Sequence, residues 1–85
     1  MYVIIVYDVN VKRVVKICNY LRRYLNWVQN SVFEGELTES ELERIKFELK
    51  SLINEEEDSI VIYVLGSEKY IKREILGTSK IDLSN

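Results

Sequence analysis

Asp8 is the residue whose type and position best suit catalysis. It follows the apolar run 2–7 and precedes a helical pattern, so its carboxylate would be held at the end of a strand. A magnesium ion usually takes one or two carboxylates together with water and substrate phosphates, so one Asp8 supplies part of a site. A two-fold axis near Asp8 would bring two copies together, and Mg²⁺ (or Mn²⁺) bound there could generate hydroxide for phosphodiester cleavage. The alternative is that Asp8 is a turn or capping residue.

The lack of histidine removes most other catalytic arrangements. The chain has no histidine and a single cysteine, Cys18. Neither a Ser-His-Asp nor a Cys-His pair can be built, a zinc site would lack its usual ligands, and no internal disulfide can form. Catalysis would therefore depend on carboxylates, a bound metal, lysine or tyrosine. Cys18 lies on an apolar helical stripe, which favours a small core residue over a reactive thiol.

Basic and acidic side chains are separated along the chain, although the net charge is only −2. Residues 34–58 carry ten acidic side chains against three basic ones, whereas residues 9–30 carry no acidic side chain and five basic ones: Lys12, Arg13, Lys16, Arg22 and Arg23. A second pattern recurs at helical spacing and interleaves an aromatic with basic residues: Arg13, Lys16, Tyr20 and Arg23. Such a face could bind the phosphates of a nucleic acid. The alternative is that both charged segments are solvated outer faces of helices.

The first half of the chain reads as a strand followed by a helix. Residues 2–7 and 59–65 are continuous apolar, β-branched and aromatic runs, which are typical of strands buried on both faces. Asn10 is predicted to cap a helix over about 11–24. The core stripe of that helix is predicted to be Val11, Val14, Cys18, Leu21 and Leu25.

Residues 27–37 read as extended chain, either one long bent strand or two short strands around a turn, with Gly35 at a bulge or close approach. Thr38 and Glu41 form a capping box that opens a second helix to about residue 54. Its core stripe is predicted to be Leu42, Ile45, Leu49 and Leu52. Residues 55–58 are predicted to form a solvated acidic loop. Residues 70–76 suggest a weaker strand ended by Gly77, and 79–83 a last extended piece.

The order of elements predicts a single ferredoxin-like domain over residues 1–85, an α/β (α+β) sandwich of the form β-α-β(β)-α-β plus a C-terminal strand. Both helices would cover one face of an antiparallel sheet. Since 85 residues leave a thin stability margin and neither disulfides nor a zinc site can supplement it, we expect a homodimer that covers the other face. Residues 78–85 are predicted to be an extension that packs on the partner subunit, by adding to its sheet edge.

Several motifs together resemble the small CRISPR-associated proteins numbered second in their series, here the Cas-two family. Tyr7-Asp8-Val9 follows the apolar strand, and Lys12-Arg13 opens the helix. The most specific motif is the Ser-Val-Phe-Glu core within Val28-Gln-Asn-Ser-Val-Phe-Glu-Gly35. Length, element order and the strand at residues 60–65 also agree, so the resemblance covers nearly the whole chain.

The resemblance implies a ferredoxin-like homodimer that is a metal-dependent endonuclease on single-stranded RNA or double-stranded DNA, and a partner of the Cas-one integrase in spacer acquisition. It maps the family's metal-binding catalytic aspartate onto Asp8. The family's other site residues fall on Tyr7, Arg13, Ser31 and Phe33. Lys16 and Arg23 would extend the nucleic-acid contact along the helix. Many members carry a basic residue where this chain has Trp27, whose indole could stack on a base instead.

Each of these residues also has an ordinary structural interpretation. Phe33 suits the core or a dimer interface, Ser31 a crowded sheet, and Tyr7 a buried ring with a satisfied hydroxyl. Tyr20 could pack or stack, and the basic residues could be solvated. For Asp8 and the basic helix, the resemblance favours the functional interpretation.

Three other functions remain open at this point. A non-catalytic dimeric scaffold could bridge the Cas-one integrase and DNA. A toxin-like ribonuclease of the VapD type shares the architecture, and a small-molecule regulatory domain is a more distant alternative. The first strand begins too early for a signal peptide, and its apolar run is too short to span a bilayer, so we expect a cytoplasmic protein without membrane association.

Overall fold

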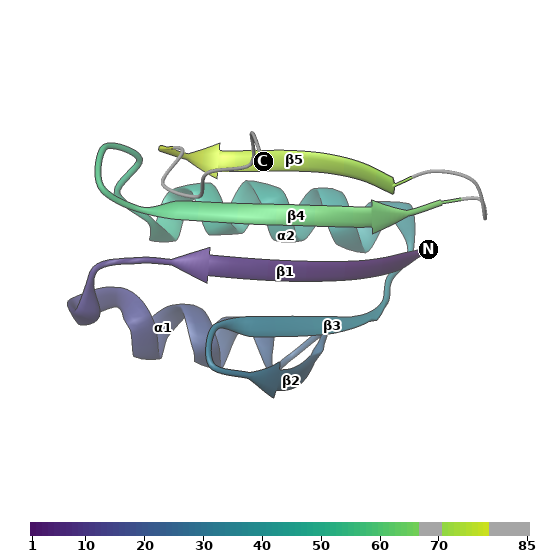
Figure 1. Ribbon diagram of the computed structural model, residues 1–85, viewed down its shortest axis with the longest axis horizontal. Coiled ribbons are helices and arrows are strands. Elements are labelled where there is room, and N and C mark those ends of the chain that lie inside the picture. Colours follow the sequence, from purple (N-terminus) through teal and green to yellow (C-terminus); the bar gives the residue numbers. More distant parts are fainter. Residues whose placement is uncertain (67–70, 79–85) are drawn as a thin grey trace.

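The computed structural model describes residues 1–66 and 71–78 and folds them into one antiparallel sheet covered by two helices (Figure 1). The strands are β1 (Tyr2–Asp8), β2 (Asn26–Gln29), β3 (Val32–Glu36), β4 (Ser59–Leu65) and β5 (Ile71–Gly77), and the helices are α1 (Val11–Leu21) and α2 (Glu39–Leu52). The strand order is β2-β3-β1-β4-β5, and every neighbouring pair is antiparallel. This arrangement confirms the predicted ferredoxin-like sandwich, with β5 as the additional strand.

Both helices begin at the predicted capping residues. The Asn10 side chain accepts a hydrogen bond from the backbone N–H of Lys12, which satisfies one of the free amides at the start of α1. Thr38 and Glu41 form the complete capping box at α2, with bonds of 3.1 Å and 2.8 Å. The two helix starts are therefore fixed by local chemistry.

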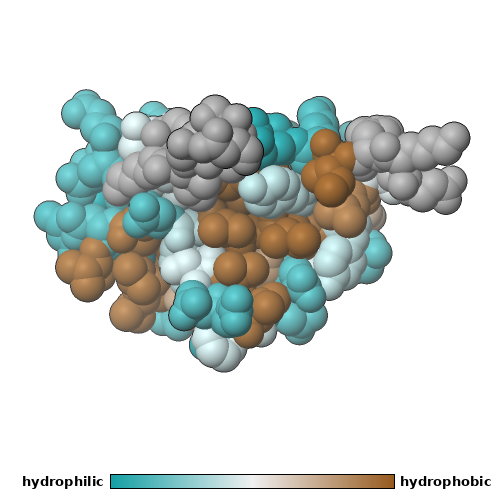
Figure 2. Space-filling view, viewed as in Figure 1, coloured by the Kyte–Doolittle hydropathy of each residue, from teal (hydrophilic) through white to brown (hydrophobic). Residues whose placement is uncertain are grey.

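The core lies between the helices and the sheet. Along β1, Val3, Ile5 and Tyr7 are buried under the helices, while the alternate residues Ile4 and Val6 face the other side and are only half-buried. The prediction that this strand is buried on both faces is therefore wrong for the single chain. Figure 2 views the sheet from this side, and apolar side chains gather at its centre.

The predicted core stripe of α1 is confirmed at the buried Leu21 and Leu25 and at Cys18, which packs against the core, but not at Val11. The buried residues of the helix are Ile17, Tyr20 and Leu21, whereas Val11 is 84% exposed. The hydroxyl of Tyr20 donates a 2.6 Å hydrogen bond to Glu48 on α2, so a tyrosine predicted on the basic stripe is turned inward. A hydrogen bond between residues so far apart in the chain cannot be predicted from the spacing of apolar residues.

The extended region 27–37 forms two short strands, the second of the predicted alternatives. Asn30 has a φ of 45° in the turn, a conformation that asparagine tolerates better than most residues. Pairing shifts register between Trp27 and Gln29, which marks a bulge in the edge strand β2. A Cβ at Gly35 would lie 3.1 Å from Leu25 Cδ2, which confirms the predicted close approach there.

The C-terminal strand pairs within its own chain. β5 follows β4 in register from Leu65↔Ile71 to Ser59↔Gly77. Thr78, the first residue of the predicted extension, donates its N–H to the Asp58 carbonyl at 2.8 Å. Residues 79–85, and with them the predicted extended piece and most of the segment expected to pack on a partner, lie outside the described residues.

Candidate metal and nucleic-acid site

Asp8 is the exposed last residue of the central strand. It pairs across the sheet with Ser59, the first residue of β4, and is followed within two residues by the cap of α1. β1 is bonded to β3 on one side and β4 on the other, so the backbone that carries Asp8 is supported by two neighbouring strands. No described residue donates a side-chain hydrogen bond to the Asp8 carboxylate, which leaves its oxygen atoms available to solvent or a ligand.

The donor set of one chain fits part of a Mg²⁺ site. Within residues 1–66 and 71–78, no group of three or more His, Cys, Asp or Glu side chains is placed to hold a metal ion. Asp58 is next to Ser59 in the chain, but Arg13 and two backbone amides already occupy its carboxylate oxygens. Asp8 is thus an exposed strand-end carboxylate without a hydrogen-bond partner among the described residues, which suits an ion held by one or two carboxylates and water.

Tyr7, Ser31 and Phe33 lie near one another where β1 passes the β2–β3 turn and the start of β3. The rings of Tyr7 and Phe33 stack with centroids 6.2 Å apart, and the Tyr7 N–H donates to the Ser31 carbonyl at 3.1 Å. Burial raises the pKa of the Tyr7 phenol, and the neighbouring Cys18 adds to this. Tyr7 is a nearly buried core residue, while Ser31 is half-exposed at the β2–β3 turn.

Phe33 and Tyr20 do not have the surface role considered for them. Phe33 is fully buried on the helix side of the sheet, and Tyr20 packs between α1 and α2 with a satisfied hydroxyl. Burial and the hydrogen bond to Glu48 raise the pKa of Tyr20 above its ordinary value, so its hydroxyl stays protonated. Neither ring can stack on a base or form a dimer interface without opening the core, so that prediction is corrected here.

Trp27 occupies the surface position predicted for a stacking residue. It lies on the edge strand β2 with 52% of its surface exposed. The indole Nε1–H donates to the Asn30 carbonyl at 2.9 Å, which orients the ring along the β2–β3 turn. Val28 beside it is also exposed. The indole face therefore remains accessible, although no described residue shows what would stack on it.

The basic side chains of α1 divide into two groups. Four are exposed to solvent and have no carboxylate partner among the described residues: Lys12, Lys16, Arg22 and Arg23. Arg23 lies with its guanidinium carbon 5.8 Å from the centre of the Tyr20 ring. Arg13 differs, because its guanidinium forms ion pairs with Glu57 and Asp58. The predicted phosphate contact therefore fits Lys16 and Arg23 better than Arg13.

Asp58 is the residue of this region that the sequence did not reveal. The acidic segment 55–58 was predicted to be a solvated loop, yet Asp58 is completely buried and Glu57 joins its ion pair with Arg13. The available signal was an acid directly before the apolar strand β4, at the same end of the sheet as the basic start of α1. The solvated-loop prediction holds for the exposed Glu55 and Glu56 and is wrong for Asp58.

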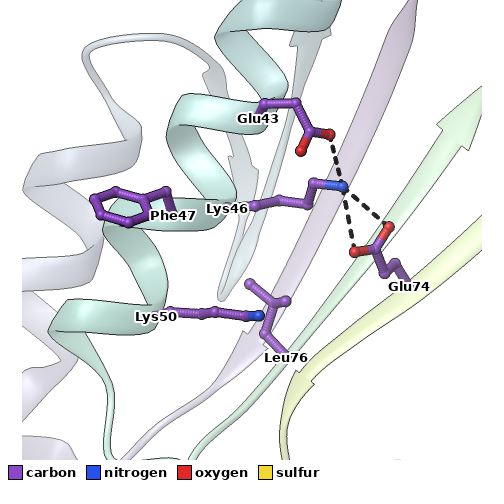
Figure 3. A pocket seen from close by; sticks show the side chains of 6 residues that line it. All are labelled: Glu43, Lys46, Phe47, Lys50, Glu74 and Leu76. Atoms are coloured by element: carbon purple, nitrogen blue, oxygen red, sulfur yellow. Dashed lines mark hydrogen bonds and ion pairs between the residues drawn. The ribbon is translucent and has the colours of Figure 1, made fainter.

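A hollow of about 240 Å³ between α2 and β5 lies away from these residues (Figure 3). Its wall includes Phe47 and Leu76, and Lys46 at its centre is paired with Glu43 and Glu74 at 2.8 Å and 3.2 Å. The charges in the hollow thus neutralise one another, and none of the predicted site residues lines it.

No helix in the described ranges is long and apolar enough to cross a membrane.

Comparison with known proteins gives one consistent family. The model of the family described as "CRISPR associated protein Cas2" matches residues 1–73. A protein of Methanosarcina acetivorans named "CRISPR-associated endoribonuclease Cas2" is 58% identical over 85 residues, covering 100% of this chain and 98% of that protein. A protein of Dictyoglomus turgidum with the same name is 54% identical over 80 residues, covering 94% and 92%.

Solved structures agree with this result. One described as "Crystal structure of cas2" superposes with a TM-score of 0.75 at 44% identity, covering 94% of this chain and 90% of its own. The structure of Streptococcus pyogenes Cas2 at pH 6.5 superposes with a TM-score of 0.72 at 39% identity, covering 80% and 89%.

Proposed function

This chain belongs to the CRISPR-associated Cas2 family, the Cas-two family of the sequence motifs, and from that premise we propose that it is a metal-dependent endonuclease of CRISPR spacer acquisition. RNA is the favoured substrate, because the Methanosarcina acetivorans and Dictyoglomus turgidum relatives carry the name endoribonuclease, with double-stranded DNA as the alternative. The observation that carries the proposal is an exposed Asp8 carboxylate at the end of the central strand, without a hydrogen-bond partner within residues 1–66 and 71–78.

The proposed site is completed by a second copy of the chain. Asp8 of each subunit would hold Mg²⁺ or Mn²⁺, and the ion, when bound, would polarise a phosphate and activate water. Asp8 holds the carboxylate at a fixed point of the sheet, and the exposed amines and guanidinium groups of α1 bind the phosphates on either side of the scissile bond. Lys16 and Arg23 are the principal contacts, with Ser31 and Trp27 at the other border of the site.

The open face of the sheet supports the homodimer that this site needs. A solvated antiparallel sheet normally alternates apolar and polar side chains, but the residues of this face are apolar in β1 and β4 alike. Ile4 pairs with Tyr63, and these two side chains together with Val6 are partly exposed, so they form an apolar strip across the two strands. Covering this strip with a second copy removes apolar surface from water.

A nuclease assay with matched variants tests the proposal. Labelled single-stranded RNA and double-stranded DNA are incubated with Mg²⁺ or EDTA and with the wild type, Asp8→Asn or Glu39→Gln. Glu39 is an exposed acid that begins α2, close to the opposite end of the sheet, so its replacement controls for the loss of one charge. We expect cleavage that requires Mg²⁺ and falls on the order of 100-fold in Asp8→Asn alone. Cleavage that persists in EDTA or in Asp8→Asn contradicts the proposal.

The second candidate is a non-catalytic scaffold that lays DNA along α1 and bridges it to the Cas-one integrase. It is favoured by the four exposed basic side chains in and directly after that helix, which need no metal to bind phosphates. If neither substrate is cleaved while both the wild type and Asp8→Asn bind duplex DNA, the scaffold is the better description. Its affinity for DNA should then fall steeply with salt. Both candidates place the protein with nucleic acid in the cytoplasm.

A further inference from the structure

Asp58 is a buried carboxylate on which several segments of the chain converge. Its Oδ1 accepts the Asn10 N–H at 2.8 Å, and its Oδ2 accepts the Asn54 N–H at 2.8 Å. The Arg13 guanidinium donates to both oxygens, through Nε at 2.5 Å and Nη2 at 3.2 Å. All four of these bonds end on one side chain that has no exposure to solvent.

The backbone of Asp58 extends the same network to two further elements. Its N–H donates to the Asn54 carbonyl at 2.8 Å, and its carbonyl accepts the Thr78 N–H at 2.8 Å. The β1–α1 loop, the first turn of α1, the segment after α2 and the end of β5 are therefore all tied to this residue. Each tie lies at the end of the sheet where Asp8 is found.

The electrostatics show that the carboxylate is held as an anion. Burial by itself would raise the pKa of Asp58, but the Arg13 guanidinium and the amides of Asn54 and Asn10 lower it to about 2. A charged, buried acceptor of charge-assisted hydrogen bonds is a strong anchor for the groups that donate to it. The Asn10 N–H is one of these donors.

On the loop side, Asp8 is held by the packing of Val9 against the core and by the hydrogen bond from the Asn10 N–H to Asp58. Its own carboxylate has no hydrogen bond from a described residue, and only Val9 separates it from Asn10, which is fixed by Asp58. On the sheet side it is paired with Ser59, the neighbour of Asp58 in the chain. Asp8 is therefore linked to Asp58 in two ways: through Asn10, two residues along the chain, and through its strand partner Ser59, which directly follows Asp58.

We propose that Asp58, clamped by Arg13, is a positioning residue that fixes the Asp8 carboxylate where two subunits can share a metal ion. The inference rests on the proposed metal site for its functional meaning, and it concerns residues that bind neither metal nor substrate. Residues behind a metal ligand commonly change metal affinity 10- to 100-fold when they are replaced. It also reassigns Arg13, the family's helix-opening basic residue, from phosphate binding to support of the site.

The test compares Asp58→Asn with Glu74→Gln. Asparagine keeps the shape of the side chain but removes the charge that Arg13 and the two amides recognise. Glu74→Gln removes a comparable ion pair, that of Lys46 between α2 and β5, on the helix side of β5 and outside the Asp58 network. Arg13→Lys is a second variant, which keeps the positive charge but loses the two-pronged geometry. If Asp58→Asn does not fold, the same measurements are made on Arg13→Lys instead.

Two readouts are measured on each folded variant, at a temperature well below its unfolding transition. The first is the hydrogen exchange rate of the Val9 and Asn10 amides, by nuclear magnetic resonance. The second is the affinity for Mn²⁺, from paramagnetic broadening of the Asp8 signals. For Asp58→Asn we expect exchange at Asn10 to become at least about 10-fold faster and Mn²⁺ affinity to fall about 10-fold or more. Glu74→Gln should change neither.

The outcomes separate this inference from the proposed function. If Asp58→Asn loses stability yet keeps wild-type exchange at Asn10 and wild-type Mn²⁺ affinity, Asp58 is a structural residue and the inference is overturned. If the wild type binds no Mn²⁺ at Asp8, the proposed function fails. The exchange readout then decides alone, since faster exchange confined to residues 8–10 in Asp58→Asn still supports positioning, and unchanged exchange overturns it.

Discussion

At the scale of single residues, two aspartates at the same end of the sheet differ because of what surrounds them. Asp8 is exposed, and no residue that the structure describes bonds to its carboxylate, so the carboxylate is available to a ligand. Asp58 is buried and accepts four hydrogen bonds, so its charge is used entirely within the protein. The same functional group is therefore a candidate ligand in one place and an anchor in the other.

Asp58 should make the stability of the fold depend on pH in the acid range. Its pKa is about 2 in the folded protein and about 3.9 in an unfolded chain, so the folded state binds the proton less readily. Its contribution is then complete above pH ~4 and is lost as the pH falls through about 2. We expect the melting temperature of Asp58→Asn to lie below that of the wild type at pH 6, and the gap to narrow towards pH 2. Circular dichroism melts across this range would contradict the assignment if the gap stayed constant.

Asp8 could be predicted as a site residue from the sequence and the burial of Asp58 could not, for a physical reason. A carboxylate directly after an apolar strand is visible in the order of residues, because strand end and helix start are local features. The partner of Asp58 is Arg13, 45 residues away, and the pair exists only once β1 and β4 lie side by side. The sequence could not decide between packing and stacking for Tyr20 for the same reason, since its partner Glu48 is 28 residues distant.

At the scale of elements, local signals fixed the starts of the helices, but tertiary contacts fixed their rotation. The caps Asn10 and Thr38 were predictable because each bonds to an amide within three residues. Helix α2 also buries Leu42, Ile45 and Leu49 of its predicted stripe. The predicted stripe of α1 is confirmed at Leu21, Leu25 and Cys18 and wrong at Val11, which is exposed, while Ile17 and Tyr20 are buried without having been predicted. The spacing of apolar residues therefore predicts the buried face of a helix only where no polar side chain, such as Tyr20, is buried by bonding to a distant partner.

Gly77 is the position where β5 is most sensitive to substitution. Its φ is 81°, and a Cβ there would collide with the Asp58 carbonyl, a backbone atom that cannot move freely. We expect Gly77→Ala to lower the free energy of unfolding by on the order of 3 kcal/mol. Gly35→Ala is the matched control, because its Cβ would meet only the flexible end of Leu25, at a cost of about 1 kcal/mol. Equal losses in urea denaturation of the two variants would argue against this account.

At the scale of the whole molecule, the chain is a two-layer structure in which both helices cover the same face of the sheet. The helices cover one face of the sheet, and the opposite face presents the apolar strip of β1 and β4 (Figure 2). The sequence predicted this need for a partner from chain length and the two-helix count. It could not show which strand residues would form the strip, because that depends on which alternate residues of each strand the helices cover.

A charge placed in the apolar strip should prevent association of two copies. Ile4→Lys puts an ammonium group at the centre of the open face, where a dimer interface would leave it without water or a partner. We expect the wild type to elute as a dimer, and Ile4→Lys as a folded monomer, by size-exclusion chromatography with light scattering. Phe47→Lys, on the outer surface of α2, should remain dimeric. A wild type that is monomeric, or an Ile4→Lys variant that stays dimeric, would exclude this face as the interface.

Trp27 has a practical consequence for studying this protein. It is the single tryptophan of the chain, and its indole is half-exposed on the edge strand beside the turn that carries Ser31. The six tyrosines absorb little light at the red edge of the ultraviolet band, so excitation at those wavelengths gives fluorescence from Trp27 alone. The unmodified protein therefore carries its own optical probe, which distinguishes a molecule that reaches the edge strand from one that lies along α1.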